Sequence, residues 1–117
     1  VKTHKLYDEQ WTAPEGAKIS FEVRAAQANL LTVGIDDHAC EVQLQGNEEW
    51  QAIELSPVDF KDAEDKPLAN WEGIKEFRLD ETERLKPPRG SKAKAKLIGS
   101  PWKGQSPEFR SLRWKTD

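Results

Sequence analysis

Tryptophan is the residue type in this 117-residue chain best suited to meet a ligand, and there are five of them. Trp11 and Trp102 lie in polar, turn-rich segments, where a large indole must pack locally or contact a ligand. A pyranose ring has an apolar C–H face that stacks on indole, and Gln105 and Arg110 can form hydrogen bonds with its hydroxyls. Packing of Trp102 over one end of the fold explains its position equally well. We predict Trp11 and Trp102 as stacking platforms, with Gln105 and Arg110 as polar contacts.

The other three tryptophans fit a structural role. Trp50 and Trp114 stand at the ends of alternating runs, on what we take to be the apolar side, and both are predicted to be core residues. Trp71 precedes a Glu-Gly-Ile segment and is predicted to close one end of the fold.

Metal and catalytic chemistry have little support in the sequence. Asp36 and Asp37 lie in an expected turn, where they could supply oxygen ligands to calcium, although a turn by itself favours Asp. Two His and one Cys are too few for a zinc site of four N and S ligands. Cys40 follows the apolar alternation of its strand, which indicates a small core residue and not a nucleophile. No pair of carboxylates stands out, so we expect no enzymatic activity.

Charge divides the chain into two unequal parts. Residues 1–83 hold 8 basic and 19 acidic residues, a net charge of -11, whereas residues 84–117 hold 10 and 2, a net charge of +8. The basic part either binds an anionic partner or neutralises acidic strands beside it, and we favour neutralisation. A pI near 5.5 argues against nucleic acid, and no apolar run is long enough to span a membrane.

A two-residue alternation of apolar and polar side chains dominates the sequence and indicates β-strands with one buried face. We expect strands at 17–25, 31–35, 40–45, 50–55, 77–79, 93–97 and 109–114. The short Gly-containing loop 46–49 predicts a hairpin, and a parity change near Ile53 predicts a bulge. In 93–97 the alanines and Leu97 should face inward, with Lys92, Lys94 and Lys96 outward. The pattern predicts an all-β fold, a β-sandwich or jelly roll of two antiparallel sheets.

One stretch resembles a known family. Residues 49–55, with Trp50 followed by Gln-Ala-Ile-Glu-Leu, lead through Val58-Asp59-Phe60 to residues 67–74 and to Phe77-Arg78-Leu79. These motifs, within a matched region of about residues 17–80, resemble the galactose-binding-like β-jelly-roll carbohydrate-binding modules of secreted bacterial glycoside hydrolases.

The resemblance implies a non-catalytic module that binds a polysaccharide or glycan and directs an attached catalytic domain to it. It also implies an extracellular or periplasmic location, structural roles for Trp50 and Trp71, and a structural calcium in many members. We expect residues 1–117 to be a single module from a larger protein, with an anionic glycan as a variant ligand. The alternative is a structural accessory domain that packs against a neighbouring catalytic domain without binding sugar.

Overall fold

Alternating sequence becomes β-structure along most of the chain. The computed structural model describes residues 2–5, 13–14, 16–87 and 89–116. Its strands are β1 (Lys2–Lys5), β2 (Lys18–Arg24), β3 (Asn29–Ile35), β4 (His38–Leu44), β5 (Gln51–Leu55), β6 (Glu76–Asp80), β7 (Thr82–Leu85), β8 (Lys96–Gly99) and β9 (Glu108–Lys115). A single-turn 3-10 helix, Pro57–Asp59, follows β5. Within these residues, no helix is long and apolar enough to cross a membrane.

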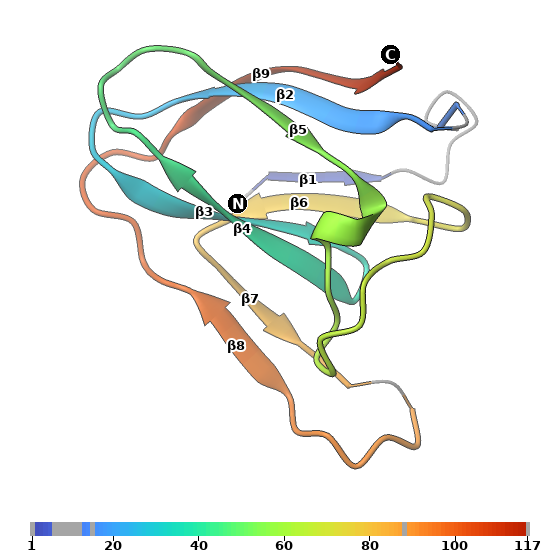
Figure 1. Cartoon of the computed structure of the whole chain (residues 1–117). Coiled ribbons are helices and arrows are strands. Elements are labelled where there is room, and N and C mark those ends of the chain that lie inside the picture. The colour runs from blue at the N-terminus through green and yellow to red at the C-terminus, as the bar shows by residue number, and fades with distance from the viewer. Residues whose placement is uncertain (1, 6–12, 15, 88, 117) are drawn as a thin grey trace.

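The strands form three antiparallel sheets. One has the order β1-β6-β3-β4, the second β5-β2-β9, and the third is the two-stranded β7-β8 ribbon. Figure 1 shows the first two sheets facing each other, with the ribbon on the far side of the β1-β6-β3-β4 sheet. The prediction of an all-β, sandwich-like architecture is therefore confirmed, with the ribbon as an additional layer.

The core lies between the two larger sheets. Ile19, Phe21 and Val23 point inward from β2, and the Phe21 ring meets Phe77 edge-on with centroids 6.0 Å apart. Each such side chain contributes about 1.5–3 kcal/mol when fully removed from water. Trp71 is also buried, and its indole N–H donates a hydrogen bond of 2.7 Å to the Ala17 carbonyl.

The ribbon covers the outer face of β3. Residues 31–35 of β3 are all buried, because one face meets the core and the other meets the ribbon. Arg78 on β6 donates from Nε to both carboxylate oxygens of Glu83 on β7, at 3.0 and 3.1 Å. A Cβ on Gly34 would lie 2.7 Å from Arg78 Nη2 and 2.8 Å from Glu83 Oε1. Glycine at 34 therefore allows this ion pair to hold the ribbon against the sheet.

The predicted hairpin between 40–45 and 50–55 is wrong. β4 pairs with β3 through the turn at Asp36 and Asp37, whereas β5 pairs with β2 in the other sheet. The loop 45–50 therefore crosses between the sheets. Gln51 joins their edges there, since its Nε2 donates to the Gln43 carbonyl and its Oε1 accepts from the Gln45 N–H.

The bulge lies elsewhere than predicted. β5 pairs with β2 in an unbroken register from Leu55 to Gln51, so Ile53 marks no irregularity. The register shifts instead between β2 and β9, between Ser20 and Glu22, where Ser111 adopts φ 61°. An extra residue in β9 at this point is typical of a β-bulge.

The predicted faces of 93–97 are also wrong. β8 begins only at Lys96, and Leu97 is 71% exposed instead of buried. Because side chains alternate across a strand, Lys96 and Ile98 face the sheet on the same side as Leu85 of β7, and Leu97 faces away.

Candidate functional site

Trp102 is half-buried in the loop between β8 and β9, and its polar atoms are committed inside the protein. The indole Nε1–H donates to the Leu30 carbonyl at 3.0 Å, and the backbone N–H donates to Glu81 Oε1 at 3.0 Å. The side chain also packs against the core cluster. Its indole N–H is therefore already bonded to β3, so a ligand would contact Trp102 through the exposed part of the ring.

The loop after Trp102 is anchored to the start of β3. Lys103 and Asn29 exchange two hydrogen bonds, from the Lys103 N–H to Asn29 Oδ1 at 2.9 Å and from Asn29 Nδ2 to the Lys103 carbonyl at 3.1 Å. Gln105 lies two residues further on and is exposed. Trp11, the other predicted stacking residue, lies outside the described residues.

Arg110 has a different set of partners, on the outer face of the β5-β2-β9 sheet. Its guanidinium Cζ lies 3.8 Å from the ring centroid of Trp50, which immediately precedes β5. Arg24 on β2 places its Cζ 4.9 Å from the same centroid. Trp50, Ala52 and Glu54 alternate with the buried Ile53 and Leu55, which puts the indole on the solvent side. Trp50 is half-buried under two guanidinium groups, and the prediction of a core role for it is wrong.

Two carboxylates complete this surface, which we call the Trp50 face and define as Trp50, Arg24, Arg110, Glu22 and Glu108. Glu22 accepts hydrogen bonds from Arg110 Nε and Nη2 at 3.2 and 3.4 Å, and Glu108 accepts from Arg24 Nη2 at 2.8 Å. Glu22 on β2 stands opposite Arg110 on β9, and Arg24 on β2 stands opposite Glu108 on β9, so each acidic residue faces a basic one across the two strands. The result is an oriented aromatic ring bordered by hydrogen-bond donors and acceptors.

The sequence contained a signal for the Trp50 face. Ile53 and Leu55 are the two aliphatic residues of their strand, and strand alternation places Trp50 opposite them. Glu22 and Arg24 are likewise the polar positions of the clearest alternating strand. The sequence did not show that Arg110 lies beside Glu22 and Arg24, because the pairing of β2 with β9 joins distant segments.

The neutralisation expected for the basic C-terminal part is confirmed for β9. Arg110 pairs with Glu22, and Lys115 Nζ lies 3.0 Å from Glu54 Oε1. The hydrogen bond and charge of Lys115 lower the pKa of the Glu54 carboxyl from its ordinary value. These contacts place basic side chains of β9 beside acidic side chains of β2 and β5.

Asp36 and Asp37 form the turn between β3 and β4. Asp36 has φ 51°, and its Oδ1 accepts hydrogen bonds from the backbone N–H groups of Lys75 and Glu76 at 3.1 and 3.0 Å. Asp37 Oδ1 lies 2.8 Å from His38 Nδ1. The two carboxylates thus have structural partners, and nowhere among the described residues do three His, Cys, Asp or Glu side chains gather as a metal site.

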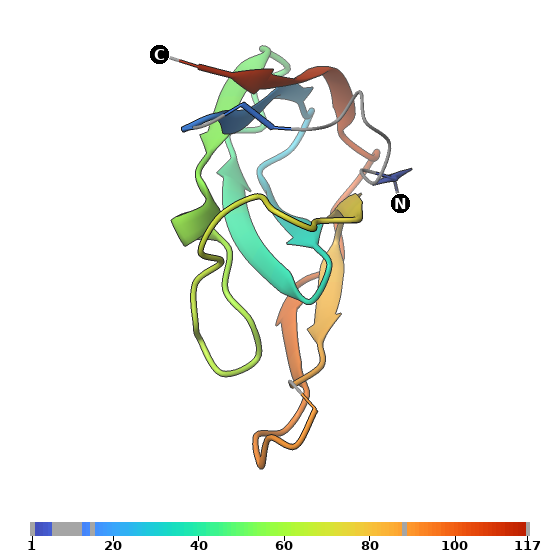
Figure 2. The same cartoon turned by 90° about the vertical axis from the view of Figure 1, so that its right-hand side faces the viewer.

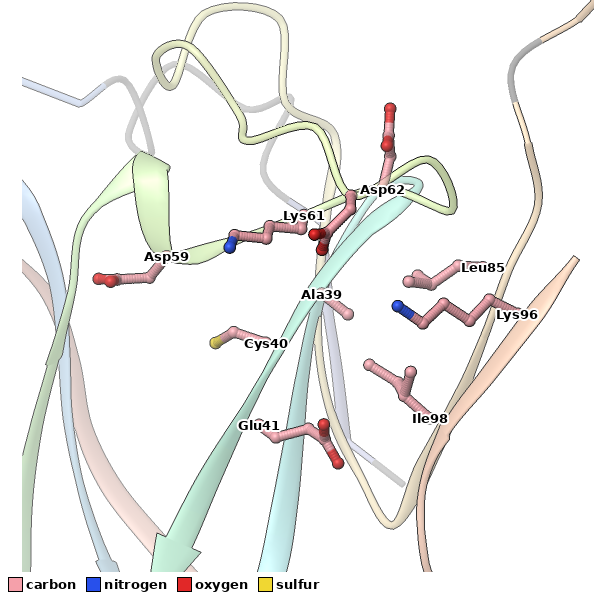
Figure 3. Close-up of a pocket in the computed structure, with 10 residues that line it drawn as sticks. Ala39, Cys40, Glu41, Asp59, Lys61, Asp62, Leu85, Lys96 and Ile98 are labelled. Carbon is pink, nitrogen blue, oxygen red and sulfur yellow. The ribbon is translucent and has the colours of Figure 1, made fainter. Parts of the chain in front are cut away.

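A cavity of about 300 Å³ lies between β4, the loop after the 3-10 helix and the ribbon. Figure 3 shows Leu85, Lys96 and Ile98 on the ribbon side of β4, with the Ala39 side chain directed toward them. The polar lining carries both signs of charge: Lys61 and Lys96, with Glu41, Asp59, Asp62 and Asp65. Asp62 Oδ1 already accepts from the N–H groups of Glu64 and Lys66, so it holds the loop together.

Cys40 also lines this cavity, but Figure 3 shows its sulfur on the side of Asp59 and Lys61, away from the ribbon. Burial, with smaller contributions from the negative charges of Asp59 and Glu41, raises the pKa of the Cys40 thiol to about 12. A thiol with this pKa remains protonated at neutral pH and is a poor nucleophile.

Comparisons of the chain with protein families, with curated proteins and with solved structures give no match. Function must therefore be argued from the geometry of the described residues.

Proposed function

We propose that this chain is a non-catalytic module that binds a glycan on the Trp50 face. The observation that supports this most directly is the placement of Arg110 and Arg24 over the Trp50 ring on an exposed sheet surface. An indole held in place by its neighbours loses little conformational entropy when a ligand stacks on it. The sugar ring would stack on the exposed part of the indole.

The polar groups around Trp50 suit the hydroxyls of a sugar. Each guanidinium has five N–H donors, more than its carboxylate partner among the described residues uses, and each carboxylate has two acceptor oxygens. Glu22 and Glu108 hold the two guanidinium groups in position. A sugar hydroxyl beside the indole can then donate to a carboxylate and accept from an arginine.

The resemblance to galactose-binding-like modules supports glycan binding, but it implies a structural role for Trp50, so the placement of the site on the Trp50 face rests on the geometry alone. The antiparallel sheets agree with a jelly roll of this family, and we include that fold in the proposal. By the same resemblance the module would act outside the cytoplasm, in the extracellular space or the periplasm. It would direct an attached catalytic domain, such as a glycoside hydrolase, to its polysaccharide.

Two alternatives to the Trp50 face can be tested. The first is the loop site predicted from the sequence, and it is tested by separate replacement of Trp102, Gln105 and Trp11. A structural accessory role is favoured by the same Trp50 face, because stacked arginine and indole are also typical of protein interfaces. In that case the face would contact a neighbouring domain and bind no sugar.

Affinity electrophoresis and titration calorimetry against a panel of neutral and acidic polysaccharides test the proposal. We expect Trp50→Ala to abolish binding to the best ligand, while Glu54→Gln, at the other end of the same sheet face, retains it. Loss of binding in Trp102→Ala but not in Trp50→Ala would move the site to the loop. No binding to any polysaccharide would overturn the glycan proposal.

Calcium at Asp36 and Asp37 remains a prediction. It requires the Asp36 carboxylate to bind the ion while it accepts two backbone N–H groups. A rise in melting temperature on addition of calcium that Asp37→Asn removes would support the site, and an unchanged melting temperature would contradict it.

A further inference from the structure

The β7-β8 ribbon extends away from the two larger sheets. Both views show it reaching beyond the β1-β6-β3-β4 sheet, with the loop between β7 and β8 at its far end (Figures 1 and 2). The contact of Glu83 with Arg78 ties the base of the ribbon to β6. The base of the ribbon is therefore anchored, and Arg84, Lys86 and most residues of the loop beyond it are exposed.

The ribbon is strongly basic. Residues 84–107 contain seven Lys and Arg and no Asp or Glu. Six of these cations belong to the ribbon and its loop, and all six are exposed: Arg84, Lys86, Arg89, Lys92, Lys94 and Lys96.

Several basic residues of the two larger sheets are paired with carboxylates. Arg24, Arg110 and Lys115 all lie within ion-pair distance of a carboxylate. Among the described residues, none of the six ribbon cations has such a partner. Lys96 lines the cavity that also holds Glu41, Asp62 and Asp65, whereas the other five cations are exposed without an ion pair among the described residues and are available to a ligand.

We propose that the ribbon binds an acidic polysaccharide, a chain that carries carboxylate or sulfate groups along its length. This inference rests on the proposed function for the choice of a glycan and adds the charge of that glycan and a second contact surface. Lys92 and Lys94 are exposed in the segment that leads into β8, and Lys96 follows at the start of the strand, so a chain of repeated anionic groups can engage more than one of them. Exposed charges of this kind contribute through long-range attraction that salt screens.

The observations favour a polysaccharide over nucleic acid or a membrane. Residues 84–101 contain no aromatic side chain, so the ribbon lacks the stacking platforms that single-stranded nucleic acid uses. The chain outside residues 84–107 has a net charge of -10, because the whole chain has -3 and this segment +7. A DNA duplex or a lipid surface is wider than the ribbon and would also face this acidic body. A single polysaccharide chain can follow the ribbon alone.

The test compares two triple variants of the full chain that lower the net charge equally. One replaces Lys92, Lys94 and Lys96 by Gln, and the control replaces Lys66, Lys75 and Lys103, which are exposed elsewhere. The probes are polygalacturonate and heparin as acidic polysaccharides, dextran as a neutral one, a DNA duplex and phosphatidylserine vesicles. Binding is measured at low and at high salt, and circular dichroism confirms that each variant is folded.

We expect the ribbon variant to lose about tenfold or more in affinity for one acidic polysaccharide and to show a weaker salt dependence, as expected when cationic contacts to a polyanion are removed. The control variant should stay within about twofold of the wild type, because only nonspecific net charge changes. Equal losses in both variants, or none in either, would overturn the ribbon proposal. So would tighter binding of DNA or of vesicles than of either acidic polysaccharide.

Trp50→Ala, measured in parallel, separates the two proposals. Polysaccharide binding that depends on Trp50 and not on the ribbon lysines would overturn the ribbon site and leave the Trp50 site intact. Binding that depends on the lysines and not on Trp50 would overturn the Trp50 site and leave the ribbon site intact. Failure of every polysaccharide to bind would overturn both.

Discussion

The guanidinium of Arg110 lies over the indole of Trp50, 3.8 Å from Cζ to the ring centroid, although the two residues belong to opposite edges of the β5-β2-β9 sheet. The contact spans the central strand β2, and the Glu22 carboxylate on that strand holds the guanidinium. A cation over an aromatic face at an exposed site contributes about 0.5–1 kcal/mol. This energy is small, so the main effect of the contact is to orient the indole.

Arg110→Lys tests whether the planar guanidinium matters. Lysine keeps the charge but lacks the flat group that stacks on indole and pairs with two carboxylate oxygens. We expect glycan affinity to fall about three- to tenfold, as for loss of about 1 kcal/mol, and the tryptophan fluorescence to change. Arg113→Lys, on the same strand without a described ring contact, is the control. Unchanged affinity in Arg110→Lys would remove Arg110 from the site.

Trp71→Phe tests the buried hydrogen bond to Ala17. The substitution keeps an aromatic ring but leaves the Ala17 carbonyl without its 2.7 Å donor. A buried acceptor without a partner costs about 1–3 kcal/mol, so the urea midpoint should fall accordingly. Trp50→Phe, which makes the same ring change at the half-buried Trp50, serves as the comparison and should cost less if the hydrogen bond is the cause. Equal losses would assign the effect to ring packing.

Gly34→Ala tests the attachment of the ribbon. The added Cβ would meet Arg78 Nη2 and Glu83 Oε1 within 3 Å, so the ion pair must move. We expect a loss of about 1–3 kcal/mol, which is typical of overpacking, together with faster hydrogen exchange in β7 and β8. The double variant Gly34→Ala, Glu83→Ala should lose less than the sum of the two single variants, because one of the two clash partners is absent and the guanidinium of Arg78 is no longer held by it. Strict additivity would show that the two positions do not interact.

Cys40 should be inert in the folded protein. Burial raises the pKa of its thiol to about 12, so the thiolate is scarce at pH 8. Reaction with a thiol reagent should be slow in the native state and should accelerate strongly in denaturant. Rapid labelling of the native protein at a rate unaffected by denaturant would contradict this assignment.

Asp62 should contribute to acid sensitivity. Burial acts to raise the pKa of its carboxyl, but hydrogen bonds from the N–H groups of Lys66 and Glu64 outweigh burial and lower the pKa below its ordinary value. The ionised form is therefore favoured by folding. Its contribution is present above the ordinary Asp pKa of about 4 and is lost as pH falls through the lower folded-state value.

Urea unfolding of wild type and Asp62→Asn at pH 7 and at about pH 2.5 measures this effect. We expect the variant to be less stable than wild type at pH 7 and the difference to shrink in acid. Glu72→Gln, at an exposed position, is the control. A difference that stays constant with pH would contradict the role of Asp62.

Alternation predicted β2 because the β5-β2-β9 sheet has one buried face and one solvent face. The strands at 31–35 and 40–45 also appear, as β3 and β4, although β3 is buried on both faces under the ribbon. Pairing partners were less visible. A short polar loop with Gly46 fits a hairpin as well as a crossing between sheets, and only the long-range pairing of β2 with β5 decides which forms.

The candidate site was predicted only in part. Arg110 was named from the sequence, but as a neighbour of Trp102, whose contacts lie on β3 and beside β7. The sequence predicts a core role for Trp50 because Trp50 and Ala52 share one side of an alternating run. A small side chain carries little information about its face, and the buried Ile53 and Leu55 fix the parity in the structure.

The register that joins β2 to β9 has a consequence for how the chain folds. Lys18 pairs with Lys115, and Lys2 with Leu79, so two sheets are completed only after distant segments have met. Proteins dominated by such non-local pairing have high contact order and fold in milliseconds to seconds, far more slowly than helical bundles. Until β9 arrives, one edge of β2 stays open, and a nascent chain stopped before residue 108 would expose a hydrophobic strand edge to its neighbours.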